Sequence, residues 1–269
     1  MDASLLAGKP SLPACGGGSM KYVFPAFPNM RGELAEYCRL YAFPRQPDCP
    51  PPDTGYIILD SGAYGLSQSG KKMDAAYIDR LAAHYREHAG KSVFCVAPDV
   101  FLNPTQTMRQ FSEWHSRHGI PVVPVVQFNS KNGSVDLHRM RKQLEFYRAY
   151  GGLLPHWEGK PFVCISNPSK RAIEGKNVVR VATLARQVMG EVWLHNLGAG
   201  WDREDILAWK NTAAFDSMDS IAYYTSAQDG WRWTTGSPVR DERPLRDVAT
   251  DNARLINDLV CAAPVHRTD

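Results

Sequence analysis

The chain has 269 residues, 43% of them hydrophobic, and a formal net charge of +3. This size allows a substantial core and fits one catalytic domain better than two independent domains. No apolar run approaches the roughly 18 residues that span a bilayer, so we expect a soluble protein with no membrane partner. The cysteine pattern, which indicates no disulfide framework, fits a reducing cytoplasm. The small positive charge permits a polyanionic partner without requiring one.

The chain opens with a segment that differs from the rest. Residues 1–19 are rich in Gly, Ser and Pro and lack the regions of a signal peptide, which predicts a flexible leader before one domain at 20–269. A first strand is expected at 21–27 and a short helical stretch at 33–41. The proline-rich segment 43–55 is expected to be a loop, because proline removes backbone donors.

Six later apolar runs each end in a polar residue, and segments of helical periodicity lie between them. The runs cover residues 56–62, 93–99, 122–127, 162–167, 192–196 and 213–219. The expected helices cover residues 74–89, 103–118, 135–150, 170–189, 203–211 and 245–260. This alternation favours a single-domain (β/α)8 barrel of the TIM type, in which the loops after the strands converge on one active site.

The polar residues at the strand ends would then share one pocket. They are Asp60, Asp99, Gln127, Ser166, Asn167, His195, Asn196 and Asp219. Asp219 and Asp60 form a pair suited to retaining glycosyl transfer, because one carboxylate can attack an anomeric carbon while the other carries protons. Asp99 and Gln127 together can bind the edge of a guanine-like heterocycle.

Structural roles stay open for several of these residues. The Asp-Ser-Gly sequence at 60–62 is also a common turn and helix cap; in a functional site, Ser61 would supply a hydroxyl. For Asp99 or Gln127 alone, a hydrogen bond within a loop is the more frequent role. His195 can be a hydrogen-bonded strand-end histidine, and the glycine-rich turn after it matches no phosphate-binding motif.

The six cysteines include no CxxC pair and no histidine at zinc-finger spacing. Neither a zinc site nor a disulfide framework is therefore indicated, and no cofactor is expected. Cys95 and Cys164 lie inside predicted strands, where small core residues are common.

Segment 226–246 breaks the strand–helix alternation, because it is polar, aromatic and rich in arginine. Aromatic rings interleaved with arginine suit stacking on bases and pairing with phosphates. A surface strand or hairpin whose tryptophans pack on the barrel is the alternative interpretation. The candidate nucleic-acid contacts are Lys170, Arg171, Trp231, Arg232, Trp233, Arg240, Arg243 and Arg246.

In their order along residues 56–225, these motifs resemble those of the tRNA-guanine transglycosylase superfamily. Its members exchange guanine for a 7-deazaguanine on a (β/α)8 barrel. The segment at 60–62 resembles the family's DSGG motif, VVPVVQ (122–127) resembles IVQGG, and AFDSMDSIAYY (214–224) resembles the nucleophile motif. The resemblance implies the following roles: Asp219 as nucleophile, Asp60 in proton transfer, and Ser61, Asp99 and Gln127 in base binding.

Two more segments resemble family motifs. FVCISNPSK (162–170) resembles a strand that contributes backbone contacts to the base. LHNLGAGWDREDILAW (194–209) resembles LMGVGTPEDILEAV and contains His195 and Asn196. The substrate contacts implied by the first segment are Val163, Cys164, Ser166 and Asn167.

The chain also departs from the tRNA enzymes. It lacks their CxCxxC and His zinc site after the nucleophile motif, while Ala63 and Thr225 replace a family glycine and arginine. A compact, zinc-free chain is more similar to the DNA-guanine transglycosylases of phages and bacterial modification clusters. The resemblance therefore implies that guanine in DNA is exchanged for a 7-deazaguanine such as preQ0, without metal or cofactor.

Three alternatives remain. The same exchange could act on tRNA or on a free nucleoside. The carboxylate pair could serve an N-glycosidase or sugar hydrolase with water as the acceptor. The chain could also be a catalytically silent nucleic-acid-binding barrel, and its oligomeric state is not determined by the sequence.

Overall fold

The computed structural model describes most of the chain. It covers residues 20–27, 30, 34, 37–44, 56–88, 93–128, 135–166, 175–200 and 203–261. The predicted leader and three candidate site residues, Asn167, Lys170 and Arg171, lie outside these ranges. None of the described helices is both long and apolar enough to cross a membrane.

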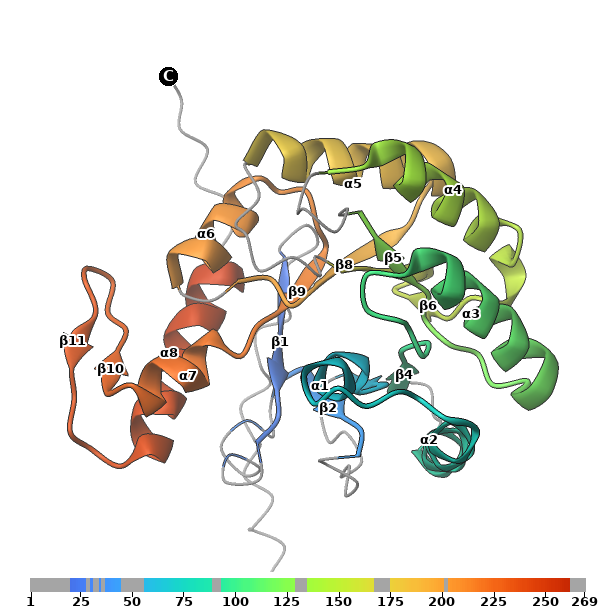
Figure 1. The fold of residues 1–269 in the computed structure, drawn as a ribbon. Helices are drawn as coiled ribbons and strands as arrows, with labels where there is room; N and C mark the ends of the chain where they lie inside the picture. Colours follow the sequence, from blue (N-terminus) through green and yellow to red (C-terminus); the bar gives the residue numbers. More distant parts are fainter. Residues whose placement is uncertain are drawn as a thin grey trace, which may run out of the picture.

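The described residues form an α/β structure around one curled, mostly parallel sheet (Figure 1). Its strand order is β4-β3-β2-β1-β9-β8-β7-β5, and β6 pairs antiparallel with β7. The strands are β1 (Lys21–Pro25), β2 (Arg39–Ala42), β3 (Ile57–Asp60), β4 (Val93–Cys95), β5 (Val125–Gln127), β6 (His156–Trp157), β7 (Lys160–Ser166), β8 (Trp193–Leu197) and β9 (Ser217–Asp219). A separate hairpin consists of β10 (Trp231–Arg232) and β11 (Val239–Arg240).

The helices lie around the outside of the curled sheet (Figure 1). They are α1 (Ala63–Gln68), α2 (Ala75–His88), α3 (Pro104–His118), α4 (Leu137–Arg148), α5 (Gly175–Met189), α6 (Arg203–Asn211), α7 (Ala222–Gln228) and α8 (Leu245–Cys261), with a 3-10 turn at Gly151–Leu153. All six predicted helices after residue 70 are confirmed. Asn103 caps α3 as its sequence position suggests, since its side chain accepts a 3.2 Å hydrogen bond from the Gln106 amide.

The predicted (β/α)8 TIM-type barrel is wrong. The sheet is mixed and curls as a half-barrel, and its edge strands β4 and β5 meet only through an isolated bridge between Val96 and Val123. Helices are spaced irregularly: α1 and α2 both lie between β3 and β4, whereas only thirteen residues separate β1 from β2. A periodic pattern identifies the individual strands, but closure of the sheet depends on strand lengths and connections that the pattern does not encode.

The helical stretch predicted at 33–41 is also wrong. Residues 39–42 form strand β2, which lies between β1 and β3 in the parallel sheet. Leu40 and Tyr41 are 6% and 2% exposed, on opposite faces of the sheet. Burial on both faces therefore outweighs the local helical pattern at this position.

Alternation along the strands divides the core into two clusters. One face of the sheet is covered by helices, and its residues pack against side chains such as Leu81, Leu144 and Ile206. The other face, termed the inner face, carries a separate cluster that stacks the rings of Phe94 and Trp193 on Trp157, at 5.0 Å and 5.1 Å. This inner cluster comprises Val23, Leu40, Ile58, Phe94, Val96, Val123, Val125, Trp157, Phe162, Cys164 and Trp193.

Candidate active site

The carboxyl ends of four parallel strands direct polar side chains to the inner face. Each of these residues stands two positions after a residue whose side chain lies on that face, so it points to the same side. They are Asp60 after Ile58, Gln127 after Val125, Ser166 after Cys164 and Asp219 after Ser217. Gln127 and Ser166 are direct neighbours in the register of β5 and β7. The predicted convergence of these strand ends is thus present in the half-barrel.

Asp219 lies at the end of β9 and is 6% exposed. Its Oδ1 atom accepts hydrogen bonds from His195 Nε2 and from the Gly198 amide, each 3.0 Å long. The described residues place no donor on Oδ2. One carboxylate oxygen is therefore held in position, while the other can meet a ligand.

His195 is fully buried in β8 and connects Asp219 to a chain of hydrogen bonds. The Trp193 indole N–H, which can only donate, bonds Ser217 Oγ at 2.8 Å. Ser217 Oγ lies 2.9 Å from His195 Nδ1. Because Ser217 already accepts from Trp193, its own proton is available for Nδ1, which leaves the imidazole proton on Nε2 for donation to Asp219. His195, a predicted substrate contact, thus holds the Asp219 carboxylate in position.

Asp60 ends β3 and belongs to a tightly held loop. Its Oδ2 atom accepts a 3.1 Å hydrogen bond from the Gly62 amide. Gly62 has φ 75°, and a Cβ atom there would lie 1.8 Å from the Phe43 carbonyl oxygen, so only glycine fits. The Tyr77 hydroxyl bonds the carbonyl oxygen of Ser61 at 2.7 Å. These contacts fix the position of the Asp60 carboxyl group.

Burial raises the pKa of Asp60 to about 6, and the nearby negative charge of Asp219 raises it as well. A carboxyl group with such a pKa can both release and accept a proton near neutral pH. The electrostatic effect of Asp219 on Asp60 also indicates that the two groups face the same region, as their strand positions require.

Asp99 and Gln127 form a second pair. Gln127 Nε2 donates to the Val100 carbonyl at 3.0 Å and to Asp99 Oδ2 at 3.3 Å. Its backbone is clamped to α4, because Gln143 donates to the Gln127 carbonyl at 2.7 Å and accepts from its amide at 2.9 Å. Gln127 Oε1 is buried without a partner among the described residues. The pair thus presents acceptor atoms for a ligand.

Burial raises the pKa of Asp99 to about 7, and the charge of Asp60 contributes to the shift. Burial also raises the pKa of the Cys164 thiol, and the charges of the three carboxylates raise it further. These carboxylates are Asp219, Asp60 and Asp99. All three carboxylates therefore affect the pKa of the Cys164 thiol, which supports their convergence on one site.

Other predicted substrate contacts have different surroundings. Cys164 is buried in the inner cluster and Cys95 in the core, as predicted for small core residues. Val163 belongs to the helix-covered face, so its side chain points away from the inner face. Asn196 pairs in register with Ile165 and Met218 of that same face, and its buried amide has no partner among the described residues. Ser61 Oγ is likewise buried and unpaired there.

The arginines predicted to hold nucleic acid are largely engaged within the protein. Arg232 pairs with Asp241 at 2.8 Å, and Arg243 pairs with Asp241 at 2.9 Å and with Asp251 at 2.7 Å. These bonds hold the pKa of Asp241 well below its usual range. Arg246 is exposed at the start of α8, where its Nε lies 3.9 Å from Asp247.

The two tryptophans of this segment also differ from the expectation. Trp233 is 4% exposed, and its amide donates to the buried side chain of Asn252 at 2.6 Å. Trp231 is 37% exposed, but the Arg240 guanidinium lies 4.0 Å from its ring centroid. The hairpin is present, and its packing against the protein matches the structural alternative. Stacking of Trp233 on a base does not fit this arrangement.

Sequence reasoning missed the residues that support the site. Trp193 and Ser217 fix the imidazole of His195, while Gly198 donates to Asp219. Gln143 and Tyr77 hold the strand ends from neighbouring helices. Ser217 could have been identified from its two-residue spacing from Asp219, since this spacing puts both side chains on one face of β9.

One group among the described residues could hold a metal ion. His84, Glu87 and His88 of α2 offer ligand atoms within 4.8 Å of one another. Burial, followed by the charge of His88, lowers the pKa of His84, which favours the neutral imidazole that binds metals. All three residues come from one helix, and none of them follows a strand end.

Comparison with known proteins does not assign this site. No protein-family model matches the chain, and no curated protein matches it. The superfamily resemblance therefore stays a prediction from short motifs.

Proposed function

We propose that the chain is a base-exchange transglycosylase that replaces guanine in DNA with a 7-deazaguanine such as preQ0. The observation that carries this proposal is the arrangement of Asp219. Its Oδ1 atom is held by two donors at 3.0 Å, and its Oδ2 atom has no partner among the described residues. A positioned, buried carboxylate with one oxygen available is suited to nucleophilic attack on an anomeric carbon.

In the first half of the reaction, Asp219 Oδ2 attacks C1′ of the target nucleotide. An ester bond forms as the bond from C1′ to guanine N9 breaks, and its electron pair leaves with the base. Asp60 donates the proton that neutralises the departing guanine. A pKa of about 6 keeps part of the Asp60 population protonated near neutral pH.

The second half reverses these steps with another base. Asp60, now ionised, accepts the N9 proton of the incoming 7-deazaguanine. N9 attacks C1′ and Asp219 departs with the electron pair of the ester bond. Two displacements at the same carbon give overall retention of configuration.

Asp99 and Gln127 would select the base. Guanine and its 7-deaza analogues carry N–H donors at N1 and at the 2-amino group. An acceptor pair formed by the Asp99 carboxylate and Gln127 Oε1 complements these donors, whereas adenine has an acceptor at N1. A buried acceptor left unpaired is costly, so this pair discriminates against adenine.

Radiolabelled preQ0, incubated with the protein and either DNA or tRNA, tests the proposal. We expect label in DNA, release of one guanine for each label incorporated, and no label with Asp219→Asn. A covalent adduct of Asp219 with the sugar should appear by mass spectrometry when preQ0 is omitted. Label in tRNA alone would mean that tRNA, and not DNA, is the acceptor. Without preQ0, release of more than one guanine per enzyme molecule would indicate a hydrolase. Neither label nor guanine release with any acceptor would contradict base exchange.

A further inference from the structure

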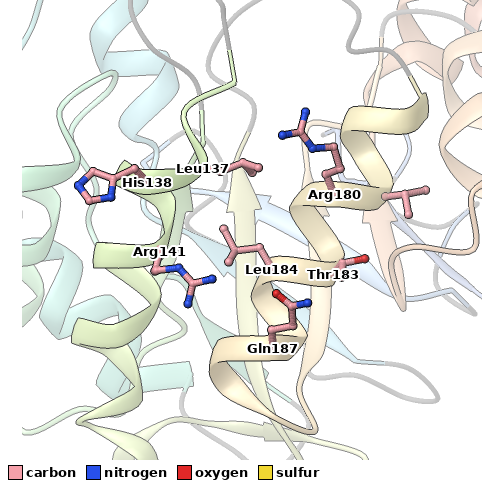
Figure 2. A pocket seen from close by; sticks show the side chains of 8 residues that line it. Leu137, His138, Arg141, Arg180, Thr183, Leu184 and Gln187 are labelled. Carbon is pink, nitrogen blue, oxygen red and sulfur yellow. The ribbon is translucent and has the colours of Figure 1, made fainter.

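A groove with a volume of about 470 Å³ lies between α4 and α5. Figure 2 shows Leu137 and Leu184 in the space between these helices, with Arg141 and Arg180 extending from opposite sides. Thr183 and Gln187 add polar groups along α5. The groove thus combines an apolar floor with cationic walls.

The two helices concentrate much of the positive charge of the chain. Together they contain seven lysines and arginines and one acidic residue, Glu145, an excess of six positive charges. The whole chain has a net charge of +3. Arg186 of α5 pairs with Asp216, but the residues that line the groove include Arg141 and Arg180 and no Asp or Glu. The groove therefore has a locally positive potential that favours a polyanion.

The two groove arginines are more weakly paired with carboxylates than Arg232 and Arg243 are. Arg141 is exposed and lies 3.9 Å from Glu145, at the limit of an ion pair. Arg180 is exposed and bonds the Asn177 side chain at 3.2 Å; no carboxylate within the described ranges pairs with it. Both guanidinium groups can therefore bind phosphate without first breaking a strong ion pair.

The start of α4, which lines the groove, is joined by a hydrogen bond to the chain just after Gln127. The Asp136 amide, which precedes α4, donates to the carbonyl of Phe128 at 2.8 Å, directly after Gln127. Helices α4 and α5 follow strands β5 and β7 along the chain. In a parallel sheet such helices begin at the carboxyl edge of the strands, so the groove residues at the start of α4 lie towards the edge that carries the carboxylates.

We propose that this groove binds the sugar–phosphate backbone of the acceptor nucleic acid beside the nucleotide that undergoes exchange. Arg141 and Arg180 contact phosphates, and the apolar floor packs against sugar. This inference rests on the proposed function, since it locates the acceptor of that same reaction. Turning a base out of a duplex costs a few kcal/mol, and phosphate contacts outside the pocket offset that cost.

Fluorescence anisotropy with a labelled single-stranded oligonucleotide tests the groove. We expect Arg141→Glu/Arg180→Glu to weaken binding at low salt by about tenfold or more. The slope of log affinity against log salt should fall by about 0.7 for each phosphate that is no longer bound. The matched control is Arg86→Glu/Arg254→Glu, which makes the same charge change at exposed positions of α2 and α8 and should retain affinity. Circular dichroism verifies that both double variants are folded.

The outcomes separate this inference from the proposed function. Asp219→Asn should bind the oligonucleotide normally but exchange no base. If base exchange occurs and the groove variant binds like the wild type, or no more weakly than the control, the groove assignment is wrong. If the groove variant loses binding only to phosphatidylserine vesicles, the surface is a membrane contact and the assignment is also wrong. If DNA binding depends on the groove but no base is exchanged, the proposed reaction is wrong and the groove assignment stands.

Discussion

The carboxylate site on the inner face and the β10–β11 hairpin both gather charged side chains, but they use them in opposite ways. In the hairpin, Arg232 and Arg243 lie within 3 Å of carboxylate oxygens and lower the pKa of Asp241. On the inner face, burial raises the pKa of Asp60 to about 6 and that of Asp99 to about 7. The charge of Asp219 adds to the first shift and the charge of Asp60 to the second.

This difference distinguishes charges that organise the chain from charges that are poised for a ligand. A folded protein can keep mutually repelling carboxylates and an unpaired acceptor such as Gln127 Oε1 only at a cost in stability. Such a cost is typical of functional sites, where a ligand later supplies the missing partners. The arginine-rich segment lacks this property, although its composition predicted nucleic-acid binding.

Removing one carboxylate from each region should give the largest difference between them. We expect Asp219→Asn to reduce base exchange by at least about 10³-fold, because an amide oxygen is a poor nucleophile. Asp251→Asn in the hairpin region should leave the rate within about twofold, since Asp251 pairs with Arg243 and, among the described residues, contacts none of the carboxylate site. Single-turnover rates with labelled base measure both effects. Equal losses would mean that Asp219 also has only a structural role.

A glycine substitution tests whether the loop after Asp60 is tightly packed. Gly62→Ala should destabilise the protein by at least about 3 kcal/mol, because it combines a positive φ with a Cβ atom 1.8 Å from the Phe43 carbonyl oxygen. Gly70→Ala is the control: its φ is 68°, but nothing lies within 4 Å of the added Cβ. It should cost about 1 kcal/mol. Denaturant unfolding measures both values, and similar costs would contradict the tight loop.

Stability against pH tests the buried acid. The folded pKa of Asp99 is about 7 and its usual value is 3.8, so its stabilising contribution is complete below about pH 4 and is lost as pH rises towards 7. Relative to wild type, Asp99→Asn should gain about 4 kcal/mol in unfolding free energy between pH 4 and pH 8. Denaturant titrations at both pH values measure this. If the difference in unfolding free energy between the variant and the wild type does not vary with pH, Asp99 is solvated.

The hydrogen-bond chain behind the nucleophile makes a smaller prediction. Ser217→Ala removes the group between Trp193 and His195, so the imidazole loses its fixed orientation. We expect kcat to fall about tenfold with KM little changed, because His195 acts through Asp219 and not on substrate. Ser217→Thr, which retains a hydroxyl, should recover part of the loss. An increase in KM alone would indicate substrate contact instead.

The smallest effect is expected in the hairpin. Arg243→Ala removes exposed ion pairs with Asp241 and Asp251, and such solvent-screened pairs contribute little to stability. Nucleic-acid affinity, measured by anisotropy, should stay within about twofold of wild type. If the affinity decreases as much as in the groove variant, the hairpin is a nucleic-acid-binding surface. Its arginines would then not differ in role from the charged groups of the carboxylate site.

The local part of the structure was largely predictable. Six helices after residue 70 and the six later strands follow from periodicity, and the Asn103 cap follows from residue type, whereas α7 was not predicted. The convergence of Asp60, Gln127 and Asp219 was also predictable, because parallel strands bring their carboxyl ends to one edge. By contrast, β2 was mistaken for helix, since its burial between two strands is invisible to a local pattern.

By itself, the sequence determined which residues form strands and helices and which polar side chains end the strands, because hydrophobic periodicity is a local property. Only the tertiary structure decided that the sheet stays a mixed half-barrel, that His195 serves Asp219, and that Arg232 and Arg243 are already paired. Those outcomes depend on distances between residues far apart in the chain. Composition and spacing contain no information about such distances until the chain has packed.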